Sequence, residues 1–563
     1  MVYRNYKVDR LMEKREALGK HRVIVLGLDG ATFDLLMPLI RRGELPNLAR
    51  LIEGGVHGVL ESILPPYTAP AWASFATGKN PGKHGVVDFW EGPSQKRRRT
   101  PVSSRSIRGE TLWSILSEEG RKVAVINLPL TYPPSPVNGV LISGMMTPCE
   151  EADYTFPKSL KGELKAQVGE YAVNPYARFG RNAHSLKKAI YWIEKREEAN
   201  RYLFEKRRWD LFINVIQAPD PIQHHFWHLL DPYHGNYNEA EAKKYENLIL
   251  ECYKEVDCVV GQRLQKLDDE TTLFVISDHG FGPAHKYFHV NRFLADLGLL
   301  AFQSPRGALH QGTRKVLGRG ADLWRSLLRA VDLFDLRIKV LDNRVRAAIR
   351  ERLDGTFSPP IDWAKTKAYC QDLAGQSIYI NLRESGEEYE EIRDYIIGQL
   401  MKLKDPETQE PIIAHAYKKE ELYQGEYLDS LPDILFSLGP HPYLPTSRLS
   451  VSSVVEGIPP YAVSGMHREQ GLFVAFGSKV QKGMAIAGAK IVDLAPTILY
   501  AMKVAIPEGM DGKVLLDIFQ PSYVASTPIR YQKPSPMEAP PYRYTEEERE
   551  EIEARLRSLG YLD

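Results

Sequence analysis

Along the chain, short runs of apolar and β-branched residues alternate with stretches that have the apolar spacing of a helix. Six such runs stand out, namely RVIVLGLDG from Arg22, KVAVINLP from Lys122, GVLISGM from Gly139, LFINVIQAPD from Leu211, TLFVISDHG from Thr272 and LFVAFG from Leu472. Runs this apolar are typical of strands that are buried on both faces of a sheet. Their alternation with helical patterns predicts an α/β fold, with a mostly parallel central sheet sandwiched by helices.

The strand and helix rhythm stops after about residue 300 and returns near residue 456. An Arg-rich amphipathic stretch from Gly312 to Leu353 lies in between, followed by polar sequence marked by Gly and Pro. We interpret the interruption as an inserted α+β cap. The predicted divisions are an N-terminal extension at 1–21, a first core part at 22–300, the cap at 301–455, a second core part at 456–520, and a Pro-rich linker with a C-terminal helix at 521–563.

The C-terminal helix begins with a Thr-x-x-Glu pattern like that of a capping box. We expect it to dock back on the core through Leu556, Leu559 and Tyr561.

Composition narrows the class of protein further. A chain of 563 residues predicts two or more domains. A net charge of +1 gives no overall field that would favour nucleic acid or an anionic membrane. The N-terminus lacks the apolar run of a signal peptide, and no apolar run is long enough for a membrane span. We therefore expect a cytoplasmic protein, whose oligomeric state the sequence leaves open.

Three of the predicted strands end in residues that can bind a metal. Asp29 ends the first run, Asp220 and His224 follow the fourth, and Asp278 and His279 end the fifth. Ligands in α/β proteins are usually held beyond the carboxyl ends of the strands. Asp and His four residues apart on a helix can face the same side and hold one divalent ion. Taken singly, each aspartate is also a plausible helix cap or turn residue.

Two further candidates lie outside the strands. Thr68 precedes an Ala/Trp/Phe-rich helix, so its hydroxyl is expected at a helix N-terminus, where an anionic substrate is favoured. An N-cap threonine would have the same pattern. His467 lies in a predicted Gly-flanked loop, where it is either a ligand or an exposed histidine. His225 and His228 are extra histidines that we assign to packing or to the substrate pocket.

The order of these motifs resembles that of the alkaline phosphatase superfamily, and specifically its type I phosphodiesterase/nucleotide pyrophosphatase family, in the branch of predicted phosphohydrolases and phosphomutases. The segments that carry the resemblance are VIVLGLDG, PPYTAPAWASFATGKNPGKHGVVDF, APDPIQHH, ISDHGF and SGMHREQG.

The resemblance implies a site for two divalent ions, usually Zn²⁺, with Mn²⁺ also possible. Carried over by position, one ion would be held by Asp220, His224 and His467. The other would be held by Asp29, Asp278 and His279. Thr68 would be the nucleophile, and the reaction would pass through a phosphothreonine that water then hydrolyses.

One position departs from the family pattern. Nucleotide pyrophosphatases typically have an Asn directly after the HGxxD motif, where it contacts the phosphoryl group, but this chain has Phe89 there. Phe cannot donate a hydrogen bond. Phosphoryl recognition must therefore come from elsewhere, or the substrate differs.

The function expected from the resemblance is metal-dependent hydrolysis of small-molecule phosphate esters, with phosphodiesters or nucleotide-like compounds as the leading substrates. In this superfamily insertions choose the substrate, so the resemblance implies that the cap at 301–455 holds specificity. A phosphomutase or a phosphoryl or phosphoglycan transferase on the same core is an alternative. A non-catalytic binding or scaffold protein is an alternative of another class.

Overall fold

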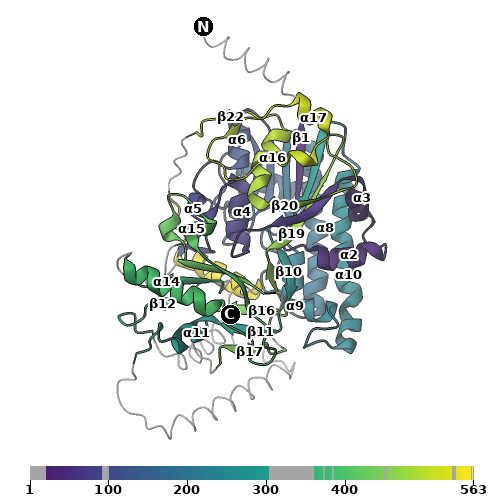
Figure 1. Cartoon of the computed structure of the whole chain (residues 1–563). Coiled ribbons are helices and arrows are strands. Elements are labelled where there is room, and N and C mark those ends of the chain that lie inside the picture. Colours follow the sequence, from purple (N-terminus) through teal and green to yellow (C-terminus); the bar gives the residue numbers. More distant parts are fainter. Residues whose placement is uncertain are drawn as a thin grey trace.

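The structure is a computed structural model, shown in Figure 1, which describes residues 21–91, 100–303, 361–371, 375–382, 386–439, 442–448, 453–460, 462–535, 541–559 and 561. The Arg-rich stretch from Gly312 to Leu353 and nearly all of the predicted N-terminal extension lie outside the described residues.

The central sheet has nine strands in the order β20-β2-β19-β9-β1-β8-β5-β6-β7. In that order the strands are Met484–Lys490, Val56–Glu61, Gln470–Phe476, Thr271–Ile276, Arg22–Leu28, Leu211–Ile216, Val123–Leu128, Gly139–Ser143 and Thr155–Phe156. The five strands from β9 to β6 are parallel, whereas β19 and β7 run antiparallel to their neighbours in that block. The prediction of a mostly parallel α/β sheet is therefore confirmed.

Helices cover both faces of this sheet and form an apolar core on each. The apolar side chains of β1 alternate between these two cores. Ile24, Leu26 and Leu28 join one core, and Val23 and Val25 join the other. The first core contains residues of α2 (Phe33–Arg41), α3 (Pro46–Gly54), α7 (Ser159–Val168), α8 (Ala183–Lys206), α9 (Pro219–Leu230), α10 (Glu239–Leu264) and α18 (Glu546–Leu559). The second contains residues of α6 (Leu112–Glu118), α16 (Leu494–Ala501) and α17 (Pro521–Ser526), and α4 (Thr68–Thr77) contributes to both.

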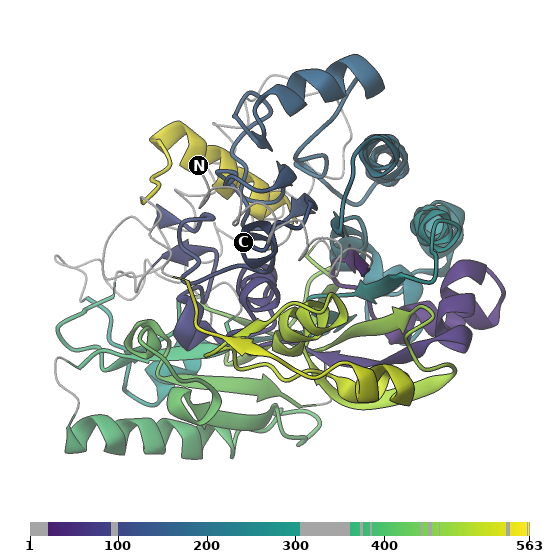
Figure 2. The same ribbon diagram turned by 90° about the horizontal axis from the view of Figure 1, so that it is seen from above.

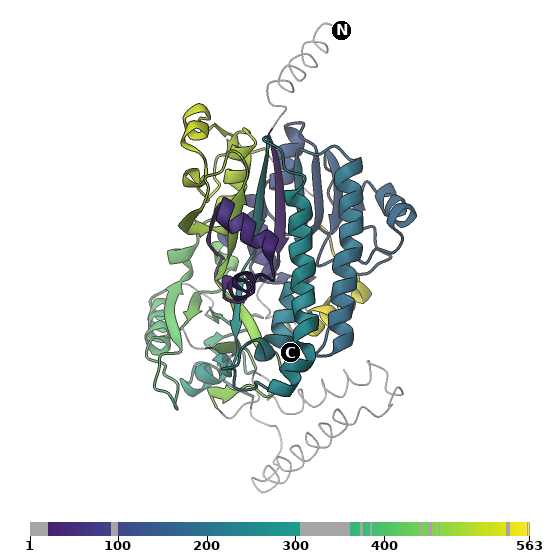
Figure 3. The ribbon, with the colours of Figure 1, turned by 90° about the vertical axis from the view of Figure 1, so that its right-hand side faces the viewer.

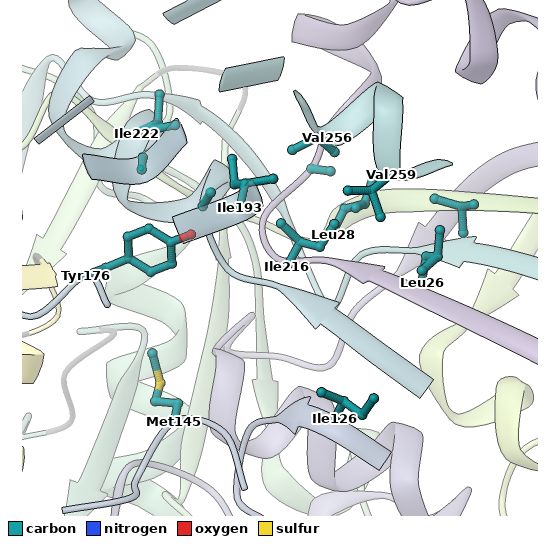
Figure 4. Packing of buried hydrophobic residues seen from close by; sticks show 14 of the residues in the cluster. Leu26, Leu28, Ile126, Met145, Tyr176, Ile193, Ile216, Ile222, Val256 and Val259 are labelled. Carbon is teal, nitrogen blue, oxygen red and sulfur yellow. The ribbon is translucent and has the colours of Figure 1, made fainter. Parts of the chain in front are cut away.

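The long helices α8 and α10 run along one face of the sheet, as Figure 3 shows. In the core beneath them, Leu28 of β1 and Ile216 of β8 meet Ile193 of α8 and Val259 of α10 (Figure 4). This packing fixes the carboxyl ends of the central strands, which is where the candidate ligands lie.

A second, smaller sheet is formed by the described residues between 361 and 448. Its antiparallel strands are β12 (Ala368–Tyr369), β13 (Ser377–Ile380), β15 (Ile434–Leu438) and β14 (Ile413–Lys418). Together with α11 (Val290–Asp296) and α14 (Glu387–Leu400) it encloses a separate apolar core. Viewed from above, α14 lies at the side of the molecule away from α8 and α10 (Figure 2).

This second region is tied to the first near the loop that leads to Thr68. The Tyr423 hydroxyl donates to the Leu64 carbonyl at 2.6 Å and accepts from the Leu64 amide at 2.8 Å. Two backbone hydrogen bonds on the same residue fix where the smaller sheet lies beside the loop that leads to Thr68.

The remaining elements are short. They comprise β3 (Trp90–Glu91), β4 (Thr100–Pro101), β10 (Gly280–Pro283), β11 (Lys286–His289), β16 (Tyr443–Thr446), β17 (Val455–Gly457), β18 (Gly465–Arg468), β21 (Ile506–Pro507), β22 (Tyr531–Gln532), α5 (Pro81–His84), α15 (Lys419–Leu422) and 3₁₀ turns at Leu428–Ser430, Ile491–Asp493 and Leu516–Ile518. Within the described ranges, every helix is too short or too polar to cross a membrane.

Helix α18 returns to the main body of the protein. Leu556, Leu559 and Tyr561 are buried in the first core, at 1%, 5% and 4% exposure. The expected docking of the C-terminal helix through these three residues is confirmed.

Candidate metal centre

The candidate ligands gather at one edge of the central sheet. Asp29 follows β1, Asp278 and His279 follow β9, and Asp220 lies in the first turn of α9, directly after β8. The strands β9, β1 and β8 are adjacent and parallel, so their carboxyl ends meet at the same edge. Helix α9 begins at Pro219, and Asp220 and His224 face the same side of it.

His467 reaches this edge from a strand rather than from the loop that the sequence predicts. It lies in β18, which pairs with β10, and Phe281 is its partner across the pair. The loop prediction was wrong because the four-residue partner strand comes from a distant part of the sequence. A Cβ on Gly465 would lie 2.4 Å from the Gln223 carbonyl oxygen, so glycine allows β18 to approach α9.

Three ligand atoms converge in a first group. The Nε2 atom of His467 lies 3.1 Å from Oδ1 of Asp220 and 3.0 Å from Nε2 of His224. The Nε2 atom of His224 lies 3.5 Å from the same Asp220 oxygen. All three side chains are at least 94% buried.

A second group adjoins the first. The Nε2 atom of His279 lies 3.4 Å from Oδ2 of Asp278 and 3.6 Å from Oδ1 of Asp29. The His279 and His467 rings stack with their centroids 3.7 Å apart. The two groups that the distances define are Asp220, His279 and His467, and Asp29, Asp278 and His279, so His279 is shared and His224 lies beside the first group. The six predicted ligands thus form one continuous cluster in which His279 adjoins both groups.

The backbone orients all three histidines in the same way. Their Nδ1 atoms lie 3.1 Å from the carbonyl of Gly465 for His224, 3.1 Å from that of Gly280 for His279 and 3.0 Å from that of Pro66 for His467. A carbonyl only accepts, so each Nδ1 carries the proton and donates it. Each Nε2 is then left with a lone pair that faces the cluster, which is the arrangement of a metal-binding histidine.

The aspartates lack the partners that buried carboxylates normally have. Among the described residues, both oxygens of Asp29 lack a hydrogen-bond partner, and so does Oδ2 of Asp278. Burial, together with the neighbouring charges of Asp278 and Asp220, raises the pKa of Asp29 well above its usual value. Burial and Asp278 do the same to the pKa of Asp220. The helix-cap alternative for Asp29 does not apply, because Thr32 caps α2.

The histidines are held in the neutral form. Burial lowers the pKa of His224 to about 3, and it lowers the pKa of His467 well below its usual value. Neutral imidazoles and unpartnered carboxylates form the donor set that divalent transition ions prefer. The residues present therefore fit a metal centre.

Thr68 lies beside this cluster. It is fully buried, and its Oγ1 lies 3.2 Å from Nε2 of His279 and 2.8 Å from the Tyr561 hydroxyl. Tyr67 is the N-cap of α4, so Thr68 is the first helical residue and not the cap. The hydroxyl therefore combines a helix N-terminus with contact to the cluster.

Two further histidines near the cluster, His225 and His228, have partners outside it. His225 donates from Nε2 to the Ser558 carbonyl at 3.3 Å, and His228 contacts the Ser464 hydroxyl at 3.0 Å. Neither belongs to the two candidate metal groups of the described residues. Sequence reasoning placed Tyr561 at the docking interface but not at the site, since no motif marks it and only the path of α18 brings it there.

A mostly parallel α/β sheet with a buried cluster of aspartates and histidines at its carboxyl edge defines an α/β protein with a candidate metal centre. The model of one protein family, type I phosphodiesterase/nucleotide pyrophosphatase, matches residues 23–467. Because this match spans most of the chain, the protein belongs to that family and is a phosphoric ester hydrolase.

Solved structures resemble the chain at low identity. Murine ectonucleotide pyrophosphatase/phosphodiesterase 5 in complex with AMP is 13% identical, with 86% of this chain and 96% of that chain covered and a TM-score of 0.45. Phosphonoacetate hydrolase from Sinorhizobium meliloti 1021 in complex with phosphonoformate is 14% identical, with the same coverage and a TM-score of 0.48. The search of curated proteins gave no match.

Proposed function

We propose that this enzyme hydrolyses phosphate esters, with phosphodiesters or nucleotide-like compounds as the leading substrates, through a phosphothreonine on Thr68 at a two-metal site. The observation that carries the proposal is the position of Thr68. Its hydroxyl lies at the N-terminus of α4 and 3.2 Å from a histidine of the candidate metal cluster. A threonine hydroxyl needs such activation, because it is a weak nucleophile at neutral pH.

The roles of the ligands follow the two groups. Asp220, His224 and His467 would hold one ion, and Asp29, Asp278 and His279 would hold the other. When bound, two divalent ions such as Zn²⁺ or Mn²⁺ would lower the pKa of the nucleophile and stabilise the charge of the phosphoryl group.

The chain itself supplies the nucleophile and its orientation. The Thr68 oxygen forms a bond to phosphorus while the bond from phosphorus to the leaving oxygen breaks. Water then breaks the Oγ1–phosphorus bond, and the net products are an alcohol and a phosphate or phosphate monoester. The partial positive charge at the N-terminus of α4 favours the anionic substrate throughout.

The test compares zinc- and manganese-loaded protein on p-nitrophenyl phosphate and on a nucleoside p-nitrophenyl phosphodiester. We expect faster turnover of the diester. Thr68→Ala should lower turnover by roughly 10³-fold or more while metal content persists, and Thr68→Ser should retain part of the activity because it keeps a hydroxyl.

The matched control is Thr77→Ala, at the other end of the same helix, where the hydroxyl donates to the Ala73 carbonyl. Unchanged turnover in Thr68→Ala would remove Thr68 as the nucleophile. A preference for the monoester would redirect the substrate assignment. Phosphoryl transfer to an added alcohol in place of water would favour the transferase alternative.

A further inference from the structure

The residue closest to the Thr68 hydroxyl comes from the other end of the chain. The Tyr561 hydroxyl lies 2.8 Å from Oγ1 of Thr68, which is a hydrogen bond in which either group can donate. A phenol is thus in direct contact with the hydroxyl that we propose as the nucleophile.

Aromatic rings hold the Tyr561 side chain in this position. Its ring centroid lies 5.0 Å from that of Phe89 and 6.0 Å from that of Tyr67, both edge to face. The rings of His224 and His467 lie at 5.6 and 5.5 Å. Such contacts fix the direction of the hydroxyl.

The helix that precedes Tyr561 is anchored as well. Arg555 donates to the carbonyls of Thr147 and Pro148 at 2.5 and 2.6 Å. The Ser558 hydroxyl accepts from the Arg178 amide at 2.9 Å, and Leu556 is buried. Several independent contacts therefore place the phenol at Thr68.

The site has need of such a donor. Among the described residues, the hydrogen-bond partners of the Thr68 hydroxyl are His279 and Tyr561. The Nε2 atom of His279 is assigned to a metal, and Phe89, buried beside Tyr561, has no donor. Tyr561 is the neutral O–H group within reach. The non-bridging oxygens of a phosphoryl group that bonds to Oγ1 lie one bond beyond phosphorus, so a donor in contact with Oγ1 can reach them.

We propose that Tyr561 is a catalytic residue, whose hydroxyl donates a hydrogen bond to a non-bridging oxygen of the phosphoryl group during transfer to Thr68. This inference rests on the proposed function. A preorganised donor of this kind stabilises the charge that develops in the transition state more than it stabilises the bound substrate, so its effect falls mainly on kcat.

The experiment compares Tyr561→Phe with the unaltered full-length chain. Both are loaded with zinc and assayed on whichever of the two p-nitrophenyl substrates the unaltered protein turns over. We expect kcat to fall on the order of 100-fold, with a smaller change in KM. Inhibition by orthovanadate should weaken, and metal content and melting temperature should stay unchanged.

Tyr544→Phe is the matched control. The Tyr544 hydroxyl donates to the Met146 carbonyl at 2.9 Å and so serves docking of the same C-terminal segment away from Thr68. Its kcat should remain that of the unaltered protein.

Three results would overturn the inference. Unchanged or faster turnover in Tyr561→Phe would show that the hydroxyl is not needed for the reaction. Faster turnover in Tyr561→Ala would show that the side chain blocks the phosphoryl position. A fall in kcat with an equal fall in metal content would show that it serves the metal centre. Absence of turnover in the unaltered, metal-loaded protein would instead contradict the proposed function, and this inference with it.

Discussion

Buried aspartates occur in two regions of this molecule under opposite conditions. Asp29, Asp220 and Asp278 at the edge of the central sheet are each at most 2% exposed, and Asp405 in the smaller region is fully buried. Asp405 accepts from Lys286 at 2.8 Å, from Tyr443 at 2.7 Å and from two backbone amides.

The opposite conditions move the pKa values in opposite directions. Burial acts to raise the pKa of Asp405, but hydrogen bonds from Lys286, Tyr443 and the two backbone amides outweigh it, so its pKa is lowered. Burial and like charges raise the pKa of Asp29 and Asp220. The protein thus supplies every partner of Asp405, whereas Asp29 and Oδ2 of Asp278 have none among the described residues, as the proposed metal centre would require.

The largest expected effect comes from removing a candidate ligand at the edge of the central sheet. Asp278→Asn and His467→Ala should each lower metal content and weaken zinc affinity by about 100-fold or more, because each removes a ligand. Turnover should fall accordingly. Asp405→Asn should retain both metal and turnover. Metal analysis after dialysis and the p-nitrophenyl assay measure the three variants, and full occupancy in Asp278→Asn and His467→Ala would show that the ligand assignment is wrong.

Removal of metal should have a smaller effect, on stability. With zinc at about one hundred times its Kd, chelation should lower the free energy of unfolding by about 3 kcal/mol, because the ion binds the folded state. Urea unfolding with and without chelator measures the difference. Asp278→Asn should show little of it and Asp405→Asn should show all of it. An equal response of all three proteins would contradict a specific centre.

The smallest effect is that of Asp405→Asn on stability. The variant leaves Lys286 without one of its partners, and we expect a loss of about 2 kcal/mol at pH 7. Because the folded-state pKa of Asp405 is lowered, its contribution is complete above the unfolded value of about 4 and is lost as the pH falls through the folded value. The difference between variant and unaltered protein should therefore shrink below about pH 4. A difference that grows in acid would contradict the assigned partners.

Part of the site could be predicted because it depends on local sequence. Asp29, Asp278 and His279 end apolar runs, and such runs form parallel strands whose ends meet at one edge. The pair Asp220 and His224 depends only on helical spacing. By contrast, the strand that carries His467 and the pairing of β18 with β10 depend on contacts between residues far apart in the sequence.

The sequence by itself determined the α/β class and the family motifs, and it predicted six candidate ligands and a candidate nucleophile, because strand periodicity and short motifs are local properties. Only the tertiary structure decided which donors lie next to the Thr68 hydroxyl. The burial of apolar residues on α18 brings Tyr561 to Thr68 across almost the whole chain. No spacing rule encodes such a contact, because it arises from the free energy of packing two surfaces together.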